Sequence, residues 1–186
     1  MKILIVAHPD DEIIWFNPQS FDSIIILFGT RHDKYTIHNA RVQSMIEHPL
    51  KNKIVFYNLM EPGYWKDKTR RFYYYKTYNK VYNIIAKIIN KNISVIFTHN
   101  SIGEYGHSDH ILVHYVVKNF VQQEALTIPI WCPIKNMTFV NNYPLQEVKF
   151  DLNLYNDIKN IYQKNGAWTW NPYYKPQDSE KFYRTY

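Results

Sequence analysis

Two clusters of histidines and carboxylates, about a hundred residues apart, are the parts of this sequence best suited to chemistry. The first reads HPDDE over residues 8–12, and the second reads GHSDH over residues 106–110. In both, side chains three apart fall on one face of a turn that opens a helix, as with His8 and Asp11 or with His107 and His110. This spacing is typical of metal ligands and of paired acid–base groups.

A set of three side chains from the two clusters would suit a catalytic metal. His8, Asp11 and His110 together offer two imidazoles and one carboxylate, which leaves a position on the metal open for water, as catalytic zinc requires. The same set suits non-haem Fe(II), and zinc is favoured only if the reaction is a hydrolysis. Asp10 points away from its neighbour Asp11 and stays free of the metal.

Each cluster also has a simpler interpretation. Asp10 or Asp11 could cap the short helix that follows them. His107 and His110 could be surface residues, with Asp109 as a charge at the start of a helix. The metal hypothesis is favoured because both clusters follow predicted strands.

Short apolar segments alternate with helical patterns and predict how the clusters are positioned. This alternation predicts an α/β fold, a Rossmann-like sandwich with a mostly parallel central sheet flanked by helices. Ligands of such sheets bind at the carboxyl ends of the strands, where the first and fourth predicted strands deliver the two clusters. The predicted strands are residues 3–7, 24–28, 54–57, 94–98 and 128–131, and the predicted helices are 11–17, 36–47, 69–90 and 107–122.

Length and composition fit one domain over residues 1–186, with residues 132–186 as a less regular portion packed on it. A last helix is expected over residues 151–162, and the aromatic tail should pack on the body, because many exposed aromatics would be costly. Cys132 is the single cysteine, which excludes a disulfide framework, and it should be buried.

Net charge and hydropathy narrow the expected partners and location. The net charge is +6, but the basic residues are scattered and only residues 66–71 approach a cluster, so no nucleic-acid partner is expected. No apolar run reaches the ~20 residues of a membrane span, so a soluble, cytoplasmic protein is expected. The glycine-rich signatures of dinucleotide and nucleotide-phosphate sites are missing from the sequence.

The motifs AHPDDE at 7–12, THN at 98–100 and GHSDH at 106–110 resemble the PIG-L/LmbE-like family of zinc-dependent de-N-acetylases. The resemblance covers roughly residues 1–118. Family members remove acetyl groups from N-acetylglucosamine in phosphatidylinositol glycans, in thiol precursors and in antibiotic intermediates. The resemblance implies an LmbE-like fold and a metal-dependent amidohydrolase acting on an N-acetylated sugar, nucleotide sugar or glycoconjugate.

The resemblance also implies roles for individual residues. His8, Asp11 and His110 would hold Zn²⁺, and Asp10 would be the general base that takes a proton from the attacking water. His107, oriented by Asp109, would stabilise the oxyanion as an imidazolium and protonate the leaving amine. Alternatively, Asp10 would return the proton itself.

The resemblance suggests roles for three further residues, each with a simpler alternative. Tyr105 occupies a position where some members place a tyrosine that assists the oxyanion, although a packing role is the alternative. Arg41 begins a helix where the family often has an arginine for substrate contact, and a solvated arginine is the alternative. Glu12 would orient the first motif, or would simply be a charge at a helix start.

The sequence departs from the family pattern in ways that leave the substrate open. Ser108 stands where proline is usual, the helix after the first motif stops early at Pro18, and the acidic-glycine element after the third strand is replaced by residues 61–65. A non-catalytic glycan-binding protein with the same fold is the alternative function.

Overall fold

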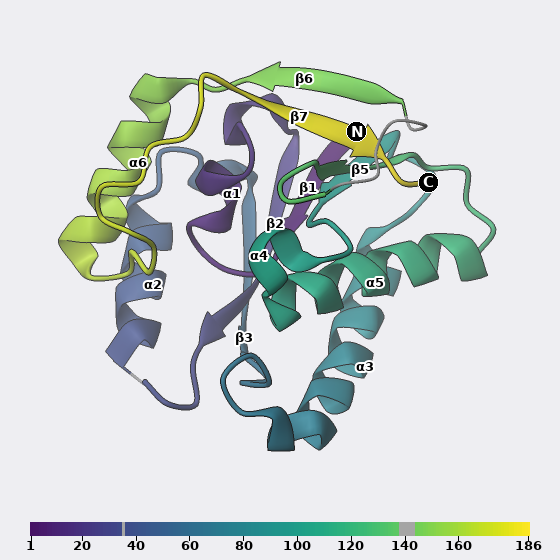
Figure 1. The fold of residues 1–186 in the computed structure, drawn as a ribbon, viewed down its shortest axis with the longest axis horizontal. Coiled ribbons are helices and arrows are strands. Elements are labelled where there is room, and N and C mark those ends of the chain that lie inside the picture. Colours follow the sequence, from purple (N-terminus) through teal and green to yellow (C-terminus); the bar gives the residue numbers. More distant parts are fainter. Residues whose placement is uncertain (35, 138–143) are drawn as a thin grey trace.

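The computed structural model describes residues 1–34, 36–137 and 144–186. It contains a seven-stranded mixed sheet flanked by helices (Figure 1). The strand order is β3-β2-β1-β4-β5-β7-β6, and the first five strands run parallel. The strands are β1 (Lys2–Val6), β2 (Ser23–Thr30), β3 (Ile54–Met60), β4 (Val95–Thr98), β5 (Ile130–Pro133), β6 (Leu145–Lys149) and β7 (Ser179–Arg184).

Helices follow most strands and cover both faces of the sheet. In Figure 1, α2 and α6 lie on one side of the sheet, and α3 and α5 lie on the other. The α-helices are α1 (Asp11–Ile14), α2 (Thr36–Glu47), α3 (Arg71–Ile88), α4 (Gly103–Gly106), α5 (Ser108–Gln123) and α6 (Leu152–Asn165), and the 3₁₀ turns are η1 (Pro18–Ser20), η2 (Lys51–Lys53) and η3 (Lys68–Arg70). The α/β prediction is therefore confirmed, including the mostly parallel sheet.

Strand β1 explains why the sequence forms two cores. All its residues after Lys2 are buried, as expected for a central parallel strand covered on both faces. Successive side chains point to opposite faces of the sheet. Ile3 and Ile5 join the core under α3 and α5, whereas Leu4 and Val6 join the core with α1, α2 and α6.

The five helices predicted from the sequence are present with approximate bounds, and α4 was not predicted. Helix α2 matches the predicted span, whereas the helix after the first motif has only four residues and ends at Ile14. Helix α6 begins where the Asp151 carboxylate caps the backbone amides of Asn153 and Leu154. None of the helices in the described ranges is both long and apolar enough to cross a membrane.

Two strands in the C-terminal portion extend the sheet and were not predicted. Strand β7 pairs antiparallel with β5 and with β6, so that β6 forms the edge of the sheet and β7 joins it to the parallel strands. Strand β6 alternates exposed and partly buried residues and has a polar sequence, LQEVK. Such half-exposed edge strands lack the apolar run that reveals a buried parallel strand.

Candidate functional site

The two polar clusters meet at the carboxyl edge of the sheet because strands β1 and β4 are neighbours. Ile5 pairs with Thr98 in the parallel register, so the residues that follow both strands emerge side by side. Connections from these strands lead to opposite faces of the sheet, which makes this edge a topological switch point. The shared edge expected from the sequence is present.

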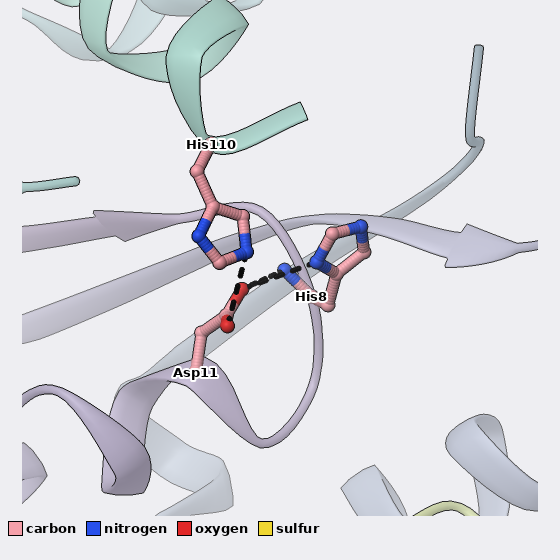
Figure 2. A group of neighbouring side chains, drawn as sticks. All are labelled: His8, Asp11 and His110. Carbon is pink, nitrogen blue, oxygen red and sulfur yellow. Dashed lines mark hydrogen bonds and ion pairs between the residues drawn. The ribbon is translucent and has the colours of Figure 1, made fainter. Parts of the chain in front are cut away.

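His8, Asp11 and His110 converge on one point (Figure 2). His8 Nδ1 lies 3.2 Å from Asp11 Oδ2, and His110 Nε2 lies 3.3 Å from Asp11 Oδ1. The potential ligand atoms of the three residues all lie within 4.8 Å of one another. Ligands on ~2 Å bonds around a tetrahedral ion stand about 3.3 Å apart, so this spacing fits a zinc ion.

The hydrogen bonding of His110 also fits a metal. Its Nδ1 lies 2.6 Å from Glu104 Oε2, which fixes the proton on that nitrogen. Its Nε2 is buried without a hydrogen-bond partner among the described residues and faces the Asp11 carboxylate. In its neutral form, His110 turns an acceptor toward the Asp11 carboxylate, and this arrangement suits a cation between the two groups. A carboxylate behind the imidazole is the usual support of a metal-binding histidine.

Negative charge is in excess around this point. Burial lowers the pKa of His8, but the surrounding carboxylates, chiefly Glu61, Asp109 and Asp11, outweigh burial and raise it to about 9. Burial and the neighbouring Asp11 carboxylate raise the pKa of Asp10 to about 7. Such a site favours a bound cation. The buried or half-buried carboxylates are Asp10, Asp11, Glu12, Glu61, Glu104 and Asp109.

Asp10 is held in a backbone conformation that is unusual for a residue other than glycine. Its φ is 96°, in the left-handed region. Its N–H donates to Glu12 Oε2 at 3.0 Å, and its carbonyl accepts from Ile14 N–H at 3.0 Å, so both sides of the residue are fixed. Thr169 donates from its backbone N–H and its hydroxyl to Asp10 Oδ2, at 3.2 and 2.8 Å.

Glu12 is a buried anchor of the first motif. It is fully buried, and besides the Asp10 amide it accepts a 2.6 Å hydrogen bond from the Tyr162 hydroxyl. A carboxylate that merely complements a helix start would be solvated. The contacts of Glu12 therefore fit a residue that orients the first motif better than a charge at a helix start.

In the second cluster, His107 and Asp109 are linked through the backbone. The Asp109 N–H donates to His107 Nδ1 at 3.2 Å, which caps α5, whereas the Asp109 carboxylate lies 3.3 Å from His8 Nε2. Burial and the imidazoles of His110 and His8 lower the pKa of His107 to about 2. The lowered pKa favours the neutral imidazole over the imidazolium expected from the sequence. Because Nδ1 accepts from the Asp109 N–H, the neutral ring carries its proton on Nε2.

A cavity of about 270 Å³ opens over the cluster. His8, Asp10, Asp11, His107 and Asp109 line it, whereas His110 lies behind them and is fully buried. One wall is aromatic and is formed by Trp65, Tyr105 and Trp170. The rings of Tyr105 and Trp170 lie 4.8 Å apart between centroids, and Tyr105 is 37% exposed, so it both packs and faces the cavity.

Arg41 also lines the cavity, but two expectations about it are wrong. It lies in the middle of α2 rather than at a helix start, and it is only 2% exposed, so it is not a solvated arginine. Its guanidinium lies 2.7 Å from Glu61 Oε1. That oxygen in turn lies 3.7 Å from His8 Nε2.

Three residues of the site were given no role from the sequence. Glu61 directly follows β3, so its place at the carboxyl edge of the sheet was a usable signal. Glu104 lies six residues before His110 in the second cluster, but its contact with that histidine depends on the loop conformation. Thr169 reaches Asp10 across 159 residues, and no local pattern indicates such a contact.

Comparison with known proteins finds similarity in the three-dimensional structure but not in the sequence searches. No protein-family model matches the sequence, and no curated protein matches it. The zinc-inhibited form of teicoplanin deacetylase Orf2 is similar at a TM-score of 0.63 with 9% identity, covering 99% of this chain and 97% of that chain. A deacetylase of teicoplanin biosynthesis, in complex with bog, is similar at a TM-score of 0.62 with 10% identity. This match also covers 99% of this chain and 97% of that chain.

A deacetylase of another antibiotic pathway is similar to the same degree. The A40926 pseudoaglycone deacetylase Dbv21 gives a TM-score of 0.59 with 8% identity, over 98% of this chain and 96% of that chain. The similarity includes the C-terminal portion, which the sequence motifs do not reach. The chain therefore has the fold of these deacetylases over nearly its whole length.

Proposed function

We propose that the protein is a zinc-dependent hydrolase of the PIG-L/LmbE type that removes the acetyl group from an N-acetylated sugar or sugar conjugate of the N-acetylglucosamine kind. The observation that carries this proposal is the convergence of His8, Asp11 and His110, with an unpartnered His110 nitrogen, beside a carboxylate in an open cavity. The fold shared with antibiotic deacetylases supports the same reaction class.

His8, Asp11 and His110 would hold the metal, which when bound polarises the amide carbonyl and makes water more acidic. Asp10 is the general base. Thr169 occupies its Oδ2, so Oδ1 is left to accept the proton of the attacking water. Because His107 is neutral, it donates a hydrogen bond to the oxyanion from Nε2, and Asp10 returns the proton to the leaving amine.

The remaining cavity residues bind the sugar. Trp65, Tyr105 and Trp170 offer apolar surface to the ring, and the Tyr105 hydroxyl is a second donor for the oxyanion. Arg41 contributes positive charge to the cavity lining, and its ion pair with Glu61 holds the guanidinium in place. A pocket of this size suits one sugar ring and leaves the attached group outside.

Metal analysis and acetate release test the proposal directly. Protein purified without a metal-affinity tag is expected to contain about one zinc ion per chain and to release acetate from an N-acetyl sugar or conjugate in a panel. Chelation should abolish release and lower the Tm, because the metal binds only the folded ligand set, and added zinc should restore both. Zinc-free protein that still releases acetate would contradict the metal role, and sugar binding without acetate release would support a glycan-binding protein instead.

Thr169→Val should separate positioning of the base from folding. Valine keeps the shape of threonine but removes the hydroxyl that holds Asp10 Oδ2, while the backbone N–H contact remains. A hydrogen bond to a charged group contributes about 1.5–3 kcal/mol, so we expect kcat to fall at least about tenfold. KM, zinc content and Tm should stay near their original values, and Thr169→Ser should restore turnover. Equal turnover in the valine and serine variants would contradict this role.

A further inference from the structure

Residues 64–80 hold most of the net positive charge of the protein. Six basic and one acidic side chain give this stretch +5, against +6 for the whole chain, so the remainder is close to neutral. We call the exposed and half-buried side chains of this stretch the basic aromatic surface. Its charged members are Lys66, Asp67, Lys68, Arg70, Arg71, Lys76 and Lys80.

The same stretch exposes large aromatic side chains. Phe72 is 72% exposed, Tyr75 54%, Tyr73 50% and Trp65 39%. A soluble surface rarely gathers so much aromatic area in one place without using it. The mixture of exposed aromatic and basic residues is typical of contact with the headgroup region of a membrane.

The basic aromatic surface forms one end of the molecule. The loop after β3, the turn η3 and the first turns of α3 lie together at the lower end of Figure 1. Two hollows flank it. One, of about 290 Å³, is lined by Lys68 and Arg71, and the other, of about 210 Å³, is lined by Arg70, Lys76 and Lys80.

We propose that the basic aromatic surface docks the protein on an anionic lipid membrane. Each basic residue near such a membrane is attracted to its negative surface potential, and the exposed rings fit the interfacial region. The two basic hollows suit lipid phosphate or carboxylate groups. Phe72 is the most exposed of the aromatic side chains here and would enter the acyl boundary.

Cations lie over four of the aromatic rings in this stretch. Lys68 Nζ lies 4.7 Å from the centre of the Tyr64 ring, and the Arg70 guanidinium lies 4.4 Å from that of Tyr73. Single-stranded nucleic acids bind by stacking bases on free aromatic faces. The observed pairing therefore favours a lipid surface over RNA.

Docking on this surface would set the orientation of the catalytic cavity. Trp65 and Lys66 belong both to the basic aromatic surface and to the wall of the cavity. A membrane bound here would lie beside the cavity mouth. The inference concerns where the protein binds and does not depend on the proposed hydrolysis.

Sedimentation with lipid vesicles tests the proposal. The protein should sediment with phosphatidylcholine vesicles that contain phosphatidylserine and not with phosphatidylcholine alone, and salt should weaken the binding. Removing three exposed charges, in the combined variant Lys68→Gln, Arg71→Gln and Lys76→Gln, should lower vesicle affinity about fivefold per charge, or roughly 100-fold in total. Phe72→Ser should weaken binding further.

Matched variants on the rest of the surface serve as controls. Lys91→Gln, Lys149→Gln and Lys175→Gln together remove the same charge from exposed positions elsewhere, and Tyr173→Ser removes an aromatic ring that is 88% exposed. These variants should sediment like the original protein, and so should Asp10→Asn, which separates docking from catalysis. Equal losses in both triple variants, or retention on single-stranded RNA without vesicle binding, would overturn the proposal.

Discussion

Asp10→Asn is expected to lower acetate release by about 10²–10⁴-fold while the protein keeps its fold and its zinc. An amide cannot accept the proton of the attacking water, and a positioned general base contributes a factor of this size. The metal ligands His8, Asp11 and His110 are untouched by the substitution. Steady-state kinetics with metal analysis of the same preparation would measure both effects.

Asparagine is the right replacement because of the backbone at this position. Residue 10 has φ 96°, and asparagine adopts positive φ more readily than most residues do. Its side-chain oxygen can still accept from Thr169, so the contact with the C-terminal portion survives. Burial and Asp11 already disfavour the charged form of Asp10, so loss of that charge should not lower the Tm.

Asp10→Ala is the contrasting variant. It also removes the base, but it loses the Thr169 contact and suits the positive φ less well, so its Tm should fall below that of Asp10→Asn. Full activity in Asp10→Asn would show that another group takes the proton. Loss of zinc in Asp10→Asn would show instead that Asp10 contributes to the metal site.

The parallel part of the fold was predictable because its strands are recognisable from the sequence alone. Strands such as β1 and β2 are continuous apolar runs, which is what burial on both faces demands. The edge formed by β6 and β7 was not predictable, since these strands gain their order from long-range antiparallel pairing rather than from local pattern. The tail was expected to pack on the body, and its strand pairing with β5 is the way it does so.

For the site, spacing in the sequence indicated which residues converge but not which residues support them. His8, Asp11 and His110 follow from two motifs at adjacent strand ends. Glu104 and Thr169 contact these motifs only because of a loop with positive φ at Glu104 and a chain crossing from the C-terminal portion. The protonation of His107 also depends on burial and neighbouring imidazoles, which a single sequence does not reveal.

Glu104→Ala is expected to reduce both stability and metal affinity, because this carboxylate ties the second cluster together. It is fully buried, accepts the Asn100 N–H at 2.8 Å, and contacts the Nδ1 atoms of His99 and His110 at 3.0 and 2.6 Å. Removing it leaves three buried donors unsatisfied, which should cost about 3–5 kcal/mol of the free energy of unfolding. Denaturant unfolding of the zinc-free protein would measure this loss.

Zinc affinity is the second quantity that this glutamate should control. Burial raises the pKa of Glu104, but His99 and His110 outweigh burial and lower it to about 2, so it remains an anion behind the His110 imidazole. Loss of such support weakens metal binding about 10–100-fold. Competition with a chromogenic chelator should show this loss in Glu104→Gln, which keeps the volume of the side chain and stays folded if Glu104→Ala does not.

The exposed Glu124 supplies a matched control for the buried glutamate. Glu124→Gln removes the same charge at the end of α5 without touching the cluster, so its Tm and zinc affinity should remain unchanged. Unaltered zinc affinity in Glu104→Gln would contradict the assignment of His110 as a ligand held through Nδ1. If zinc affinity falls but stability stays at the wild-type level in the Glu104 variants, Glu104 acts on metal binding and not on folding. The three donors would then have found other acceptors.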